Sequence, residues 1–287
     1  MPVIFGTSLA VVIHGSAFNF FRFFLALAAM MILHTAANML SDVFDFKRGL
    51  DREITPVTGA IVRGWLSAGQ VQTGSAVLFV LGCAIGLYLV SVSGTVLLII
   101  GAVGVAIGLF YTGLKYHALG DFAVFLNFGI LGSLGAWVVQ TKNFSWLPII
   151  WTIPMAMLVS AILHANNWRD SLSDREKRVT TIASLLGDQG SLWYYGVLIF
   201  GPTLIIFLLM LGPRFLSGRV IAIPPTFLLV LLALPRALAL WGRARRRRNP
   251  SRPMDFIVLD GGTAQYNLTF GLLCTAALWL RFVLDKL

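Results

Sequence analysis

Long apolar runs are the feature that most limits the folds open to this chain. Only 12% of the 287 residues are charged, against about 25% in soluble domains. A transmembrane helix needs about 20 mostly apolar residues, and most of the runs approach that length. We therefore predict an all-α polytopic membrane protein with about nine transmembrane helices. The runs cover about residues 2–13, 20–40, 70–92, 95–111, 121–140, 146–165, 191–212, 219–241 and 265–284.

The pattern within the runs favours helices over the strands of a β-barrel. The apolar residues are continuous and do not alternate with polar ones, as they would in barrel strands. The first run is short for a span, so we expect a shortened first helix. No basic segment precedes it, so we expect no cleavable signal peptide.

Basic residues predict the orientation of the chain in the membrane. The connections after the second, fourth, sixth and eighth runs contain Lys47, Arg48, Arg52, Arg63, Lys115, Arg169, Arg175, Lys177, Arg178, Arg243, Arg245, Arg246, Arg247, Arg248 and Arg252. The other side has only Lys142, Arg214, Arg219, Arg281 and Lys286 near water. Basic loops mark the cytoplasmic side, so we expect an integral protein of the cytoplasmic (inner) membrane. The net charge of +10 then indicates contact with anionic lipids and not with nucleic acid.

Two segments carry carboxylates where an apolar run ends and a basic connection begins. The spacing i, i+4, i+7 places on one helical face Asn38, Asp42 and Asp45. The spacing i, i+4, i+8 does the same for Asn166, Asp170 and Asp174. Both segments lie on the same predicted side of the membrane. Their likeness suggests one transmembrane domain, residues 1–287, with pseudo-repeated halves of about 1–120 and 121–287.

Clustered carboxylates of this kind predict a metal site. Neighbouring carboxylates repel one another, and each raises the other's pKa unless cations lie between them. Two such faces turned toward each other would bind a divalent metal. Mg²⁺ is the natural choice, because it prefers oxygen ligands and keeps positions open for substrate phosphates.

The connection from Tyr111 to Asp121 is a third candidate segment. Lys115 is the single basic residue there and could contact a phosphate as a point charge, although a topology-setting lysine explains it equally well. Tyr111 could line an apolar cavity. The sequence has no Gly-x-x-x-x-Gly-Lys-Ser/Thr segment, so a P-loop nucleotide site is not supported.

These segments resemble the two aspartate-rich motifs of the UbiA superfamily of intramembrane prenyltransferases. The motifs are Asn38-x-x-x-Asp42-x-x-Asp45 with Asp51, and Asn166-Asn167-x-Arg169-Asp170-x-x-x-Asp174. The spacing of the first motif is similar to that of the MenA-like branch, the 1,4-dihydroxy-2-naphthoate prenyltransferases. The sequence departs from the family pattern at Ser41, where an Asn is usual, and at Val179, where a Lys is common.

The resemblance implies a fold, a reaction and a set of site residues. It implies nine transmembrane helices around a central cavity, capped by cytoplasmic loops. Mg²⁺, which we expect as two ions, would bridge a prenyl diphosphate to Asp42, Asp45, Asp170 and Asp174. The residues expected to contact the diphosphate are Asn38, Asn166, Lys115, Arg169, Lys177 and Arg178, with Asp51, Tyr111, Arg63 and Asn167 as further candidates.

The reaction implied is transfer of a prenyl group to an aromatic acceptor, with 1,4-dihydroxy-2-naphthoate of menaquinone biosynthesis as one candidate. Other acceptors of the same scaffold (a quinone precursor, a chlorophyll-like ring or a glycerol ether) and an intramembrane terpene cyclase are alternatives. A transporter is a third reading, since pseudo-repeats and intramembrane polar residues also occur in transporters. Nearly all acidic residues lie at the ends of runs and not at their middles, which favours the enzyme.

Overall fold

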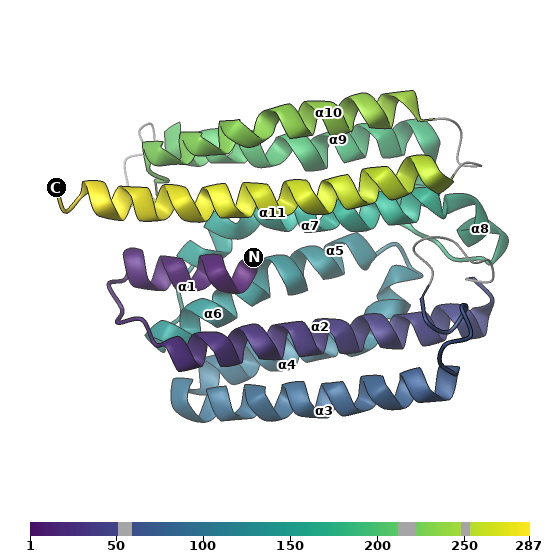
Figure 1. Cartoon of the computed structure of the whole chain (residues 1–287), viewed down its shortest axis with the longest axis horizontal. Helices are drawn as coiled ribbons and strands as arrows, with labels where there is room; N and C mark the ends of the chain where they lie inside the picture. Colours follow the sequence, from purple (N-terminus) through teal and green to yellow (C-terminus); the bar gives the residue numbers. More distant parts are fainter. Residues whose placement is uncertain (51–58, 212–221, 248–252) are drawn as a thin grey trace.

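The protein is a bundle of helices that lie roughly side by side (Figure 1). The computed structural model describes residues 1–50, 59–211, 222–247 and 253–287. Within these ranges the chain forms helices and one isolated β-bridge, and no strand.

The chain contains eleven α-helices, one π-helix and one 3₁₀-helix within the described residues. They are α1 (Pro2–Val12), α2 (Phe20–Arg48), α3 (Ala68–Ser93), α4 (Thr95–Lys115), α5 (Gly120–Val124), the π-helix η1 (Phe125–Leu131), α6 (Gly132–Thr141), α7 (Leu147–Arg169), α8 (Ser171–Glu176), α9 (Ile182–Leu211), the 3₁₀-helix η3 (Pro225–Ala233), α10 (Leu234–Arg246) and α11 (Pro253–Leu284). The elements α5, η1 and α6 form one continuous helical stretch, as do η3 and α10.

Eight helical stretches in the described part of the chain are long and apolar enough to cross a membrane. The predicted all-α membrane fold is confirmed. The first predicted span corresponds to α1, which has 11 residues and is shorter than the roughly 20 that a span needs. This agrees with the expectation of a shortened first helix.

Several helix ends differ by more than a few residues from the predicted span boundaries; helix α2, for example, continues to Arg48 and not to about residue 40. Helix α11 begins at Pro253, not near residue 265, and so includes Asp260. Helix α9 begins at Ile182, not at 191, because it includes a short segment before a break at Gly187, where φ is 66°. The start of the predicted span 219–241 lies partly outside the described residues.

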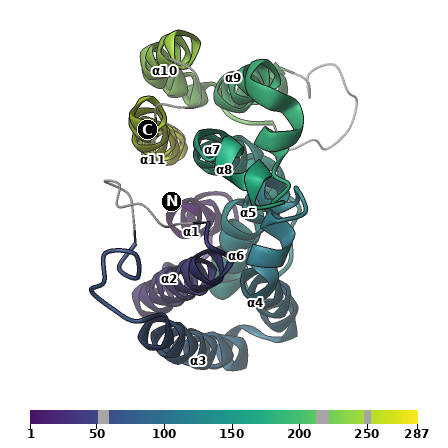
Figure 2. The same cartoon turned by 90° about the vertical axis from the view of Figure 1, so that its right-hand side faces the viewer.

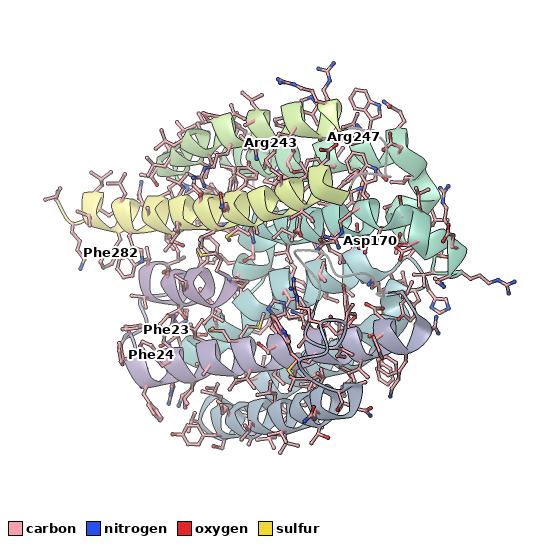
Figure 3. The ribbon with its side chains drawn as sticks, turned by 45° about the vertical axis from the view of Figure 1, so that its right-hand side comes forward. Phe23, Phe24, Asp170, Arg243, Arg247 and Phe282 are labelled. Carbon is pink, nitrogen blue, oxygen red and sulfur yellow. The ribbon has the colours of Figure 1, made fainter. Side chains whose placement is uncertain are left out.

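Successive long helices alternate in direction, so their ends gather at two opposite ends of the bundle. Helices α2, α4, α7 and α10 finish at the end that also holds α8 (Figure 1). Figure 2 looks at the bundle from that end. Asp170 and Arg247 lie there, whereas Phe23, Phe24 and Phe282 lie at the opposite end (Figure 3).

Helix α2 ends where the local sequence stops it. Gly49 adopts a left-handed conformation, with φ 75°, and its amide donates to the Asp45 and Phe46 carbonyls. Glycine takes this conformation at little cost. The first motif therefore lies in the last turns of a regular helix, as predicted.

Apolar packing around the end of α7 holds the second motif in place. Helix α7 packs against α9 and α11, and Trp168, Tyr195 and Phe256 are fully buried between them. The Trp168 ring lies 5.2 Å from the Phe256 ring in an edge-to-face arrangement, a favoured geometry for aromatic pairs. Trp168 immediately precedes Arg169, so this packing fixes the end of α7.

A cavity of about 410 Å³ lies among α2, α3, α4, η1 and α6. Its lining is apolar except for a few groups such as the Asn127 amide. Five glycines are among its lining residues: Gly82, Gly86, Gly101, Gly104 and Gly108. An added Cβ at Gly86 would meet no atom within 4 Å, so this position has room for a side chain.

Candidate active site

The first motif centres on Asp45, whose carboxylate is nearly buried at 6% exposure. Lys115 Nζ donates to Asp45 Oδ2 at 3.1 Å, and the Tyr116 hydroxyl donates to Asp45 Oδ1 at 2.6 Å. Both donors come from the end of α4, so these contacts join α2 to α4. The Arg48 guanidinium lies over the Tyr116 ring, 4.2 Å from its centroid.

The Tyr116 phenol is a donor that stays protonated. Burial, the hydrogen bond to Asp45 and the Asp45 charge together raise the pKa of Tyr116 above its ordinary value. The phenol therefore donates to the carboxylate throughout the range in which proteins are usually assayed.

The other residues of the first motif lie in different environments. Asn38 and Asp42 are exposed on the same side of α2, two turns and one turn before Asp45, respectively. Ser41, the departure from the family pattern, is buried at 7% exposure. Asp51 lies outside the described residues.

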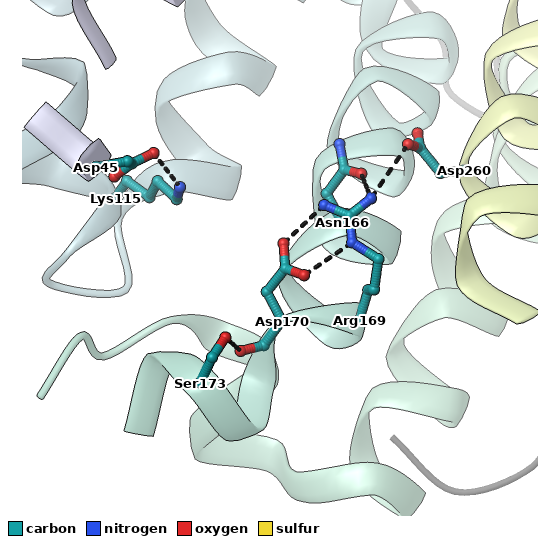
Figure 4. Close-up of polar contacts among 7 residues, drawn as sticks. All are labelled: Asp45, Lys115, Asn166, Arg169, Asp170, Ser173 and Asp260. Carbon is teal, nitrogen blue, oxygen red and sulfur yellow. Dashed lines mark hydrogen bonds and ion pairs between the residues drawn. The ribbon is translucent and has the colours of Figure 1, made fainter. Parts of the chain in front are cut away.

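The second motif centres on Arg169. Its Nε and Nη2 donate to the two oxygens of Asp170 at 2.8 and 2.7 Å, a two-point ion pair. Its Nη1 donates to Asn166 Oδ1 at 3.2 Å. Figure 4 shows these contacts together with the Asp45–Lys115 pair.

The predicted continuous helix through the second motif is wrong. Helix α7 ends at Arg169, Asp170 is the junction, and Asp174 lies on the separate short helix α8. Backbone bonds nevertheless preserve the spacing, since Asp170 N donates to Asn166 O at 3.1 Å and Asp174 N to Asp170 O at 2.9 Å. Asp174 is buried, at 4% exposure.

A backbone bridge connects the segment after α4 to the segment after α8. Ala118 N donates to Thr180 O at 2.7 Å, and Thr180 N donates to Tyr116 O at 3.2 Å. Lys115 is consequently held near both motifs: it pairs with Asp45, and the Asp174 carboxylate contributes to the electrostatic field at its ammonium group.

The remaining predicted residues occupy different environments. Tyr111 is half-buried and lies in the field of Lys115, Asp121 and Asp45. Arg63 stacks over Trp65, 5.2 Å from the ring centroid. The other placements are as follows: Lys177 and Arg178 are exposed after α8, Val179 is buried, and Asn167 is buried.

A sequence model described as the UbiA prenyltransferase family matches residues 1–259. The chain belongs to the UbiA prenyltransferase family. It is accordingly a prenyltransferase-family enzyme, and the transporter reading is set aside.

Animal relatives match the UbiA-family chain over most of its length. UbiA prenyltransferase domain-containing protein 1 of Danio rerio is 32% identical over 277 residues, which are 94% of this chain and 77% of the relative. The Homo sapiens protein of that name is 31% identical over 278 residues, 94% of this chain and 76% of the relative. The Drosophila melanogaster homologue is 30% identical over 285 residues, 96% of this chain and 74% of the relative.

Two solved structures share the fold. The apo structure of a UbiA homologue from Aeropyrum pernix K1 has a TM-score of 0.66 and 18% identity, covering 99% of this chain and 98% of that one. A structure of digeranylgeranylglyceryl phosphate synthase has a TM-score of 0.61 and 15% identity, covering 96% and 92%.

UbiA-family enzymes generally use Mg²⁺, and the donor set of this chain suits that ion. Among the described residues, no three His, Cys, Asp or Glu side chains form a preassembled metal cluster. The available donors are carboxylate and amide oxygens, and the charges of Asp45 and Asp170 are balanced by Lys115 and Arg169. Mg²⁺ commonly binds through one or two carboxylates plus substrate phosphates, so a site completed by a diphosphate is compatible with this arrangement.

Sequence reasoning missed two features near the UbiA motifs. The first is Asp260 on α11, whose Oδ2 lies 4.0 Å from Arg169 Nη1. An ionisable residue inside an apolar segment is a functional signal, but the predicted ninth span began after this position.

The second feature is a buried polar cluster between α5 and α7. Asp121 Oδ2 lies 3.6 Å from His164 Nδ1, and Asn167 Nδ2 donates to Asp121 Oδ1 at 3.4 Å. All three residues are less than 5% exposed. The Asn167 amide is thus hydrogen-bonded to Asp121 in the buried interior of the bundle.

Proposed function

We propose that this UbiA-family enzyme transfers a prenyl group from a polyprenyl diphosphate to 1,4-dihydroxy-2-naphthoate within the membrane, as a step of menaquinone biosynthesis. The observation that carries the proposal is spatial. Two motifs, more than 100 residues apart in the sequence, lie at the same end of the bundle. Lys115 pairs with Asp45 of the first motif and lies in the electrostatic field of Asp174 of the second, and an apolar cavity lies among the adjoining helices.

This layout matches the two parts of the donor. A prenyl diphosphate has a polyanionic head and a long apolar tail. The head suits the charged end of the bundle, where cationic side chains and metal-binding carboxylates occur together. The tail suits the cavity of about 410 Å³, whose lining is almost wholly apolar.

We assign each motif residue a role in binding the diphosphate head of the prenyl donor. The carboxylates of Asp42, Asp45, Asp170 and Asp174 would hold the Mg²⁺, which we propose as two ions. Bound Mg²⁺ would act as a Lewis acid toward the departing pyrophosphate. Lys115 and Arg169 would donate to phosphate oxygens as charge develops there, assisted by the Asn38 and Asn166 amides.

Exclusion of water is the second requirement of the reaction. Cleavage of the carbon–oxygen bond leaves an allylic cation, which water would capture before the acceptor ring could attack. The bridge between Ala118 and Thr180 closes one side of the charged end with backbone hydrogen bonds. The buried Tyr116 and Val179 side chains beside it add apolar cover.

The sequence supports the proposed acceptor and the proposed orientation. The first-motif spacing from Asp42 to Asp51 resembles the MenA-like branch and supports the naphthoate acceptor. The basic connections lie at the charged end of the bundle, which supports an active site that faces the cytoplasm.

A panel of acceptors tests the proposal. Full-length protein in lipid nanodiscs is incubated with geranylgeranyl diphosphate, Mg²⁺ and one acceptor at a time, and prenylated products are identified by mass spectrometry. The expected result is a product with 1,4-dihydroxy-2-naphthoate alone. A product with another aromatic or glycerol acceptor would replace the naphthoate. A cyclised hydrocarbon without any acceptor would indicate a terpene cyclase.

A further inference from the structure

Arg169 holds a carboxylate that the proposed reaction needs. Its two-point contact uses both oxygens of Asp170, and a carboxylate engaged in this way is a poorer ligand for a metal ion. Binding of Mg²⁺ by Asp170 would therefore be strengthened if Arg169 loosened this contact.

The third nitrogen of the same guanidinium faces another acid. Arg169 Nη1 lies 4.0 Å from Asp260 Oδ2, on the side away from Asp170 (Figure 4). Both side chains are largely shielded from solvent, at 14% exposure for Arg169 and 19% for Asp260. Asp260 belongs to α11, whereas Arg169 and Asp170 lie at the end of α7.

A second acid beside Arg169 needs an explanation. With Asp170 and Asp260 beside one Arg169, the group carries a net charge of minus one close to the site proposed for a polyanion. Like charge alone would weaken binding of the diphosphate. A shielded guanidinium that loses its carboxylate without a replacement is strongly disfavoured, and Asp260 provides that replacement.

We propose that Asp260 is a positioning residue that takes over Arg169 when Asp170 binds the metal of the Mg²⁺–diphosphate complex. In the structure described, the guanidinium is centred on Asp170. In the loaded state it would form its short contact with Asp260, and Asp170 would be released to the metal. The inference rests on the proposed function, because it assumes a metal-bound diphosphate at the second motif.

Metal binding without turnover provides the test. Full-length protein in nanodiscs is titrated with Mn²⁺, an EPR-visible substitute for Mg²⁺, in the presence of the unreactive analogue geranylgeranyl thiolodiphosphate. The variants are Asp260→Asn and Asp260→Ala, which remove the charge, and Asp260→Glu, which keeps it. Two charge-removing variants are used so that the result does not depend on the folding of one.

The expected effect is a loss of Mn²⁺ affinity of about tenfold for Asp260→Asn, as is typical when a residue behind a metal ligand is changed. Asp260→Glu should recover most of the affinity. In an Arg169→Gln background, Asp260→Asn should cause no further loss, because the two residues act through one contact.

Asp188 provides a matched control. It pairs with Arg247 at the same end of the bundle and accepts a hydrogen bond from Trp168 Nε1 at 3.0 Å. Asp188→Asn should lower the thermal midpoint Tm without changing Mn²⁺ affinity, as expected of an acid with a structural role only.

Each contrary outcome has a separate meaning. Unchanged or tighter Mn²⁺ binding in Asp260→Asn would overturn the inference, and so would an equal loss in the Arg169→Gln background. If the wild-type protein with the analogue binds no Mn²⁺, the proposed function itself fails.

Discussion

The Tyr116 hydroxyl donates a 2.6 Å hydrogen bond to Asp45 Oδ1, which links the segment after α4 to the first aspartate-rich motif. The contact is buried on both sides. It orients one carboxylate oxygen, while Lys115 holds the other.

Removal of this hydroxyl should destabilise the protein. Tyr116→Phe leaves a buried carboxylate with one donor fewer, which should cost about 1–3 kcal/mol of unfolding free energy. The measurement is Tm in nanodiscs by intrinsic fluorescence, with the exposed Tyr88→Phe as control. An unchanged Tm in Tyr116→Phe would show that the hydrogen bond contributes nothing.

The same residue predicts a pH dependence. The pKa of the Tyr116 phenol is raised above the unfolded value of about 10. Its contribution to stability is therefore complete below about pH 10 and is lost as the pH rises through the folded-state pKa. Wild-type Tm should fall more steeply than that of Tyr116→Phe above about pH 10; parallel curves would contradict this.

Much of the site could be predicted from the sequence, because helical spacing is a local property. Asn38, Asp42 and Asp45 share a face in any regular helix, and α2 is regular up to Gly49. Alternation of the spans then places both motifs at one end of the bundle.

The parts that could not be predicted depend on tertiary contacts. The break at Asp170 does not follow from a Gly or Pro at that position. The approach of Asp260 to Arg169 depends on how α11 packs against α7, and the Asp121–His164 pair depends on how α5 packs against α7. None of these pairings has a fixed sequence separation.

Lys115 should matter for donor binding more than any exposed lysine nearby. A charged hydrogen bond contributes about 1.5–3 kcal/mol, so Lys115→Met should raise KM for geranylgeranyl diphosphate by roughly tenfold or more. Lys47→Met is the control, since Lys47 is exposed at the same end and donates to Gln72 at 3.0 Å. Equal effects of the two substitutions would argue against a specific role.

Gly101 should influence the length of the prenyl chain. It lines the apolar cavity, and an added Cβ would meet no atom within 4 Å. Gly101→Leu should therefore fold normally while shortening the space for the tail. For this variant we expect the ratio of kcat/KM for geranyl diphosphate to kcat/KM for geranylgeranyl diphosphate to rise at least about tenfold above the wild-type ratio.

Gly113→Leu is the control for that experiment. Gly113 lies on the same helix, has equal space for a side chain and does not line the cavity. A shift of the same size in Gly113→Leu would contradict the assignment of the cavity to the tail.

The most direct test of the account is release of pyrophosphate from geranylgeranyl diphosphate by full-length protein in nanodiscs with 1,4-dihydroxy-2-naphthoate, measured with Mg²⁺ and with EDTA. The release rates of Asp42→Asn and Asp170→Asn are compared with that of the wild type, provided that each variant has the same Tm as the wild type. The account predicts release by wild type with Mg²⁺, none with EDTA, and a loss of at least about 100-fold in each variant, as when a group that stabilises developing charge is removed. Release that persists in EDTA, or at the wild-type rate in either folded variant, would contradict the claim that the two motifs form the metal-dependent site.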